Sequence, residues 1–228
     1  MKMSVLLVEY AQIANQVYND AGSFLLAGWV CQRFKMDKPV FRGGELTSDG
    51  FQGGSFYKQE TNQLVIGFKG TVPTMAADLL ADLTIALQRI PDQANTAMRY
   101  LDMWRAVQPD AEVSLVGHSL GGGLCQVVGS WRDTRFVTFN APAMGTNWLA
   151  AHVNIADPVN MVRTILAHRR DDGVNYRLLN DPVSKIGNHI GRVVKIDGGF
   201  GVTNAHSMDN VVDVITRTAS LRDQDPFA

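Results

Sequence analysis

Residues 113–125 read Val113-Ser114-Leu115-Val116-Gly117-His118-Ser119-Leu120-Gly121-Gly122-Gly123-Leu124-Cys125, and they hold the pattern from which the fold is predicted. Within this stretch, a Gly-x-Ser-x-Gly pattern lies between an apolar run that predicts a strand and a segment that predicts a helix. This arrangement forces the serine onto a sharp turn and lifts its hydroxyl clear of the sheet edge. The flanking glycines let the turn form without a Cβ clash. Ser119 is therefore the predicted nucleophile.

Two other interpretations of this stretch exist. In the first, the stretch is a glycine-rich turn with an incidental serine. In the second, the turn binds a phosphate on its backbone amides. The usual phosphate-loop signatures are absent, because no Lys-Ser or Lys-Thr follows the glycines and the chain holds no G-x-G-x-x-G. The strand-to-helix setting favours the nucleophile.

Strand-like and helix-like stretches alternate along the chain, which predicts an α/β fold whose mostly parallel sheet is covered by helices on both faces. Such a sheet carries its site at the carboxyl ends of the strands. With 228 residues, of which 46% are hydrophobic, the chain fits one domain over residues 1–221, followed by a tail at 222–228 that is expected to be too polar to fold. The predicted strands are 55–58 and 64–68, joined as a hairpin, then 113–116, 135–140 and 174–180. The predicted helices are 10–18, 75–87, 94–107, the segment from 124, and a helix after His206.

Charge and hydropathy exclude several classes of function. The 21 basic and 22 acidic residues give a net charge of -1, which provides no attraction to nucleic acid or to an anionic membrane. The longest apolar run, residues 24–31, is too short for a transmembrane segment. No signal peptide is recognised, so a cytoplasmic location with reduced Cys31 and Cys125 is expected, although an export system that reads no amino-terminal signal would leave no trace.

A serine nucleophile needs a histidine as its base and an acid that orients the histidine. In chains with this strand–serine–helix arrangement, the acid follows the serine and the histidine follows the acid. Of the five histidines, His118 lies in the turn itself, with its side chain expected to point away from the hydroxyl. His206, in a loop before an amphipathic helix, is the predicted base, and His189 is the alternative.

The acid is a choice between two Asp-Pro-Val sequences, at Asp157 and at Asp181. Asp157 precedes a proline and a run of apolar residues at helical spacing, which is typical of a helix cap. Asp181 ends a strand-like run, which would place its carboxylate at the same sheet edge as Ser119. Asp181 is therefore the predicted acid.

From about residue 64 to 212 the chain resembles the class 3 lipases, the fungal triacylglycerol lipases and their bacterial relatives. The segments that carry the resemblance are Phe68-Lys69-Gly70-Thr71, the acidic-apolar segment 78–83, Thr138-Phe139-Asn140-Ala141-Pro142, and Asn180-Asp181-Pro182-Val183 followed by His189-Ile190-Gly191. The chain departs from that family in having Lys69 in place of Arg and Asn140 in place of Gly. It also lacks the histidine-glycine segment that the fungal enzymes carry before the serine turn.

The resemblance implies an α/β-hydrolase fold and a hydrolase of lipid esters. It also implies that Asp181 is the acid and that His189 is not catalytic. By the same match, Thr71 and the backbone amide of Leu120 would form the oxyanion hole. Residues 71–90 correspond to the mobile lid of the fungal enzymes. They are rich in apolar side chains and form either a lid that contacts a lipid surface transiently or a plain core helix.

The sequence thus predicts a serine esterase that acts on glycerolipid or phospholipid esters. Ser119, His206 and Asp181 would form and hydrolyse an acyl-enzyme, with Thr71 and Leu120 stabilising the oxyanion and with no metal or cofactor. An acyltransferase of the same fold is the alternative among enzymes. A catalytically silent relative that only binds its ligand is the alternative outside them.

Overall fold

A seven-stranded sheet in the order β1-β4-β5-β6-β7-β8-β9 forms the centre of the computed structural model, which describes residues 4–18, 26–32, 39–42, 45–48, 50–70, 90–145 and 172–228. The strands β4 and β5 make the predicted hairpin, and a short 3-10 turn, η1 (Gln59–Thr61), joins them. The bounds are β1 Val30–Gln32, β4 Gly53–Lys58, β5 Gln63–Phe68, β6 Glu112–His118, β7 Arg135–Phe139, β8 Gly173–Leu178 and β9 Arg192–Ile196, and a separate hairpin pairs β2 Pro39–Arg42 with β3 Glu45–Ser48.

The sheet changes from antiparallel to parallel at β5. β1, β4 and β5 pair antiparallel, whereas β5, β6, β7, β8 and β9 pair parallel in chain order. Because parallel strands end at the same edge, the segments that follow β6, β7 and β8 come together there. The structure confirms the predicted α/β-hydrolase fold with a mostly parallel sheet.

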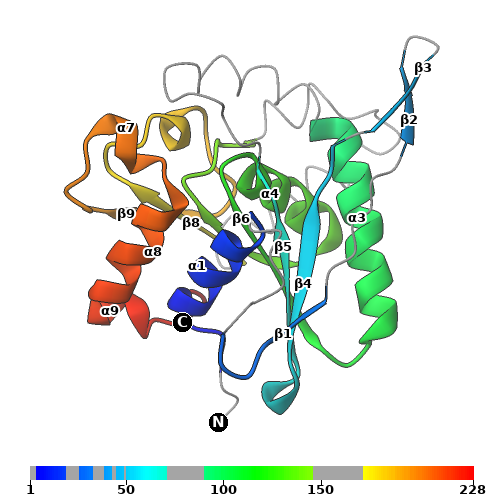
Figure 1. Cartoon of the computed structure of the whole chain (residues 1–228), viewed down its shortest axis with the longest axis horizontal. Helices are drawn as coiled ribbons and strands as arrows, with labels where there is room; N and C mark the ends of the chain where they lie inside the picture. The colour runs from blue at the N-terminus through cyan, green and yellow to red at the C-terminus, as the bar shows by residue number, and fades with distance from the viewer. Residues whose placement is uncertain are drawn as a thin grey trace.

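Helices cover both faces of the sheet (Figure 1). On one face, α3 (Ile90–Val107) and α4 (Leu120–Arg132) pack on Leu64, Ile66 and Phe68 of β5. On the other face, α1 (Leu7–Gln16) and α8 (Met208–Arg217) pack on Val65 of the same strand. This alternation follows from the two-residue period of a strand, which sends successive side chains to opposite faces. The remaining short helices are η3 Val183–Lys185, α7 Val202–Ala205 and α9 Ala219–Arg222.

The prediction that residues 222–228 are too polar to fold is wrong. The Leu7 amide donates to the Gln224 carbonyl at 2.8 Å, and the Phe227 ring packs edge-on against the Tyr10 ring with centroids 6.2 Å apart. The Arg135 guanidinium lies over the same phenylalanine ring, 5.4 Å from its centroid. One aromatic side chain therefore anchors a segment whose other residues are mostly polar, because an apolar ring gains more from burial than the polar neighbours lose.

Several predicted features lie outside the described residues. They include Thr71, the predicted helix 75–87 with most of the lid segment, and Asp157. Within the described ranges, no helix is both long enough and apolar enough to cross a bilayer.

Candidate active site

Ser119 occupies the turn between β6 and α4 in a strained backbone conformation, with φ 54° and ψ -131°. A side chain in this region is uncommon and marks a position that the surrounding structure enforces. Two glycines make the turn possible. A Cβ on Gly117 would lie 2.4 Å from the Gly121 carbonyl, and a Cβ on Gly121 would lie 2.1 Å from the Phe68 carbonyl oxygen. The predicted strand–serine–helix turn is therefore formed, with Ser119 at its apex.

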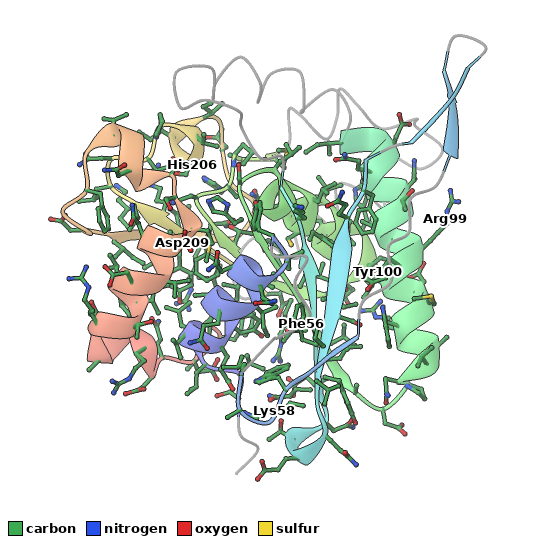
Figure 2. The ribbon with its side chains drawn as sticks, in the orientation of Figure 1. Phe56, Lys58, Arg99, Tyr100, His206 and Asp209 are labelled. Atoms are coloured by element: carbon green, nitrogen blue, oxygen red, sulfur yellow. The ribbon has the colours of Figure 1, made fainter. Side chains whose placement is uncertain are left out.

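His206 ends the short helix α7 and meets this serine across the sheet edge. Its Nε2 lies 2.9 Å from Ser119 Oγ, and its Nδ1 lies 2.8 Å from Asp181 Oδ1. Because a carboxylate can only accept, Nδ1 carries the proton and Nε2 accepts from the serine hydroxyl. Figure 2 shows His206 beside α7, at the end of the molecule opposite Lys58. Ser119 and His206 are 4% and 7% exposed, so both are largely withdrawn from solvent.

Asp181 follows β8 and is fully buried. Its carboxylate also accepts hydrogen bonds from the backbone amides of Val183 at 3.3 Å and Ser184 at 2.8 Å. Burial by itself raises the pKa of this carboxyl, but the hydrogen bonds from His206 and Ser184 and the nearby imidazole outweigh that effect and leave the pKa below its usual value. Asp181 is therefore a stable anion facing the imidazole.

The Leu120 amide begins α4 beside the serine. Within the described part of the chain, no hydrogen bond takes up its N–H, as expected for the first turn of a helix. Thr71, the other predicted oxyanion donor, lies outside the described residues, but its neighbour Gly70 packs on the serine turn. A Cβ on Gly70 would lie 2.7 Å from the His118 carbonyl oxygen and 3.2 Å from the Gly121 nitrogen.

His118 lies closer to the site than the sequence suggests. It makes no hydrogen bond to the serine hydroxyl, but its ring centre is 4.9 Å from that of His206, and its Nε2 is 2.7 Å from the His206 carbonyl oxygen. Burial and the neighbouring His206 lower the pKa of His118 to about 3. His118 is thus a neutral neighbour of the predicted base.

The alternative base, His189, is not brought to the serine. Its Nε2 lies 3.0 Å from the Ser184 carbonyl oxygen, on the turn that carries Asp181. The Arg177 guanidinium donates to the same carbonyl at 3.1 Å. His189 therefore contacts the backbone of the acid-bearing turn.

Sequence reasoning missed the residues that surround the three predicted ones. Tyr18 places its hydroxyl 3.1 Å from His118 Nδ1, and Asn140 donates to the Ala205 carbonyl at 2.7 Å. In the sequence, Tyr18 is only the last residue of the predicted helix 10–18, and Asn140 is only a departure from the glycine of the resembled family. An asparagine directly after a buried strand is the one signal that could have pointed to the site edge.

The described residues contain no cluster of three or more metal-binding side chains. What the geometry offers instead is a relay of hydrogen bonds from a carboxylate through an imidazole to a hydroxyl. Such a relay can deprotonate the hydroxyl as it attacks an electrophilic carbon and can return the proton to a leaving group.

Comparisons with known proteins agree with this geometry. The sequence profile of a family described as "Phospholipase-like: Tle-like phospholipase domain" matches residues 9–221. The search of curated proteins found no match.

Similar solved structures are lipases. They include the Lip2 lipase from Yarrowia lipolytica, with 17% identity, a TM-score of 0.53 and coverage of 84% of this chain and 77% of that one. Another is the Rhizomucor miehei lipase in its propeptide complex, with 16% identity, a TM-score of 0.52 and coverage of 85% and 68%. At these identities the likeness establishes a shared fold.

Proposed function

The chain belongs to the family of Tle-like phospholipase domains, and from this premise we propose that Ser119, His206 and Asp181 carry out the hydrolysis of lipid carboxylic esters. The observation that supports these roles is the continuous relay of two short hydrogen bonds, 2.9 Å from His206 Nε2 to Ser119 Oγ and 2.8 Å from His206 Nδ1 to Asp181 Oδ1. Each bond connects groups in the order that acyl transfer needs.

In the first half-reaction, Ser119 Oγ attacks the ester carbonyl while His206 Nε2 takes the hydroxyl proton. The tetrahedral intermediate collapses, the ester C–O bond breaks, and His206 gives the proton to the departing alcohol. In the second half, His206 deprotonates a water that attacks the acyl-enzyme, the bond between the acyl carbon and Ser119 Oγ breaks, and His206 gives the proton back to Ser119 Oγ as the fatty acid leaves. Asp181 holds the imidazole in the required tautomer and stabilises its charged form throughout.

The developing oxyanion needs hydrogen-bond donors close to Ser119. The Leu120 N–H is one such donor, because it starts α4 directly after the nucleophile and is not used by another described residue. Thr71 is the proposed second donor, supported by the packing of Gly70 on the serine turn. A donor of this kind lowers the barrier by about 3 kcal/mol.

We propose a phospholipid acyl ester as the substrate, in preference to triacylglycerol. The support is the description of the matched family as a phospholipase domain over nearly the whole chain. A substrate of this class resides in a bilayer, so the protein has to contact a lipid surface at least transiently.

A fluorophosphonate probe tests the proposed nucleophile, because such probes label only serines that a neighbouring base activates. The wild type is expected to label and Ser119→Ala to remain unlabelled. Ser130→Ala is the matched control, because that buried serine lies on the same helix and only donates to the Gln126 carbonyl; it should label like the wild type.

Turnover measured in parallel on a soluble short-chain ester, a triacylglycerol emulsion and phospholipid vesicles tests the substrate. Fastest release of fatty acid from vesicles supports the proposal, and fastest release from the emulsion contradicts the phospholipid preference. An unlabelled, inactive wild type would instead favour a protein that only binds its ligand. Acyl transfer to an added alcohol in place of hydrolysis would favour an acyltransferase.

A further inference from the structure

Two side chains at the ends of neighbouring strands form hydrogen bonds to consecutive backbone carbonyls, those of residues 205 and 206, beside the predicted base. Asn140, directly after β7, donates its side-chain amide to the Ala205 carbonyl at 2.7 Å. His118, the last residue of β6, places Nε2 2.7 Å from the carbonyl oxygen of His206 itself. Both contacts are buried, and both residues lie at the carboxyl ends of strands rather than in the loop that they hold.

We propose that His118 and Asn140 are positioning residues that clamp the backbone at residues 205 and 206 and so fix the imidazole of His206 against Ser119. This inference rests on the proposed function, because it assigns the clamp a role in activating the same serine. Neither residue touches the reacting atoms.

A clamp is useful here because His206 lies in the link between α7 and α8, where no helix or strand fixes the backbone. The helix α7 has only four residues, and a single helical turn is too short to be stable by itself. Gly201, at its amino-terminal cap, has no heavy atom within 4 Å of the place where a Cβ would lie. A displacement of about 1 Å at a catalytic group can cost about 100-fold in rate, so a base on such a segment has to be held from outside.

Asn140 is suited to the clamp by its own backbone. Its φ of 46° lies in the left-handed region, which asparagine tolerates better than most residues. Its backbone N–H donates to the Tyr176 carbonyl at 2.9 Å, and its side-chain oxygen accepts from the Leu178 amide at 2.9 Å. Because β8 leads directly to Asp181, Asn140 links the end of the acid-bearing strand to the segment that carries the base. The glycine that the class 3 lipases have here could adopt this φ but could form neither of the two side-chain hydrogen bonds.

His118 is held in one tautomer by its partners. A carbonyl can only accept, so the proton of His118 is on Nε2. The Tyr18 hydroxyl then shares its one proton between two acceptors of His118, Nδ1 at 3.1 Å and the carbonyl oxygen at 3.2 Å. The same hydroxyl accepts from the Gly70 amide at 3.1 Å. The chain of bonds therefore runs from the segment before Thr71, through Tyr18 and His118, to the backbone of His206. These bonds connect Gly70, which packs on the serine turn, to the backbone of His206, which carries the predicted base.

The test compares Asn140→Gly, His118→Leu and His118→Gln with the wild type. For each we measure kcat and KM on a soluble ester, the maximal rate of fluorophosphonate labelling, and thermal stability. Asn140→Gly keeps the backbone conformation and removes the side-chain bonds, whereas the Gln amide can replace the Nε2–H of His118. Asn175→Ala is the matched control, because Asn175 is an equally buried amide that holds the Ile190 and Arg192 carbonyls instead.

We expect Asn140→Gly and His118→Leu each to lower kcat and the maximal labelling rate by about 10- to 100-fold with little change in KM, as misplacement of a base predicts. His118→Gln should recover most of that loss. Asn175→Ala should lower thermal stability and leave kcat unchanged. In the wild type, the Nδ1–H of His206 should give a sharp downfield proton signal in NMR, and this signal should broaden in the two clamp variants.

Three results would overturn the clamp: full kcat per folded molecule in Asn140→Gly and His118→Leu, an equal loss of kcat in Asn175→Ala, or an unchanged His206 signal in the clamp variants. If His118→Leu does not fold, Asn140→Gly and His118→Gln decide the question. Failure of the proposed function is recognised separately, because the wild type itself would then neither label nor turn over, while the NMR signal would still report on the clamp.

Discussion

A neutral imidazole suits residue 118 better than a charged one. Its Nε2–H meets a carbonyl, its Nδ1 faces a hydroxyl, and the ring of His206 lies only 4.9 Å away. His206 has to carry a positive charge during the proposed turnover, and two like charges at that separation in a buried site would oppose each other. Burial keeps His118 uncharged and so removes that conflict.

The same burial predicts how stability depends on pH. The folded-state pKa of His118 is about 3, lowered by burial and by His206 and partly offset by Asp181, whereas an unfolded histidine titrates near 6.5. Between these values the unfolded state binds more protons, so the free energy of unfolding falls as the pH falls, with a slope from this residue of up to about 1.4 kcal/mol per pH unit.

Urea unfolding of the wild type and of His118→Gln between pH 4 and 7 measures this slope. The variant lacks the titrating group, so its stability should fall less steeply than that of the wild type on acidification below about 6.5. Groups that do not interact with His118 contribute equally to both proteins, whereas Asp181 and His206 interact with it electrostatically. Parallel curves would show that His118 does not titrate differently in the folded state.

At the scale of elements, the serine turn depends on how closely β5, β6 and α4 approach one another. The carbonyl of Phe68, at the end of β5, lies where a Cβ of Gly121 would have to be. This contact brings the start of α4, with the Leu120 amide, against Gly70 at the end of the described part of that segment. The glycine is thus required by packing between elements rather than by its own backbone angles.

Gly121→Ala is expected to be strongly destabilising. A methyl group would lie 2.1 Å from the Phe68 oxygen and 2.9 Å from the Gly70 nitrogen, both of them backbone atoms that cannot rotate away. Overpacking of this kind costs at least about 2 kcal/mol of unfolding free energy. Gly201→Ala is the control, because nothing lies within 4 Å of the added methyl, and it should change stability by less than about 0.5 kcal/mol. Equal urea midpoints for the two variants would contradict this account.

In the molecule as a whole, the candidate site and the contacts of the carboxyl-terminal tail lie at opposite ends of the parallel strands. Ser119, Asn140 and Asp181 follow the carboxyl ends of β6, β7 and β8. The carboxyl-terminal tail instead meets Arg135, the first residue of β7, and Tyr10 of α1. In Figure 1 the C-terminus accordingly lies beside α1 and α9, away from α7.

Phe227→Ala should therefore lower stability without changing the chemistry. Loss of the packed ring is expected to cost about 1 to 2 kcal/mol of unfolding free energy, while kcat on a soluble ester stays at the wild-type value. Asp225→Asn provides a comparison in the same tail that keeps the ring. A Phe227→Ala variant as stable as the wild type would show that the ring contributes nothing to stability. A lower kcat per folded molecule would show that the tail affects the geometry of the site.

Much of the fold was predictable because its signals are local. The strand before Ser119, the glycines around it and the helix after it follow one another directly in the sequence. The two strands of the β4–β5 hairpin are also neighbours in the sequence. The tail was mispredicted because its composition is polar, whereas its contacts, such as Phe227 with Tyr10 and the Gln224 carbonyl with the Leu7 amide, are with residues far away in the sequence. Local composition carries no information about such a partner.

The reactive turn, the parallel architecture and the order of serine, acid and histidine were predictable from the sequence, since each follows from neighbouring residues, from the period of strands and helices, or from chain order. The sequence favoured His206 over His189, but its contact with Ser119, 87 residues away, and the hydrogen bonds by which His118 and Asn140 hold the backbone beside it are seen only in three dimensions. Hydrogen bonds between distant segments depend on strand register and loop closure, and no local pattern of residues records either.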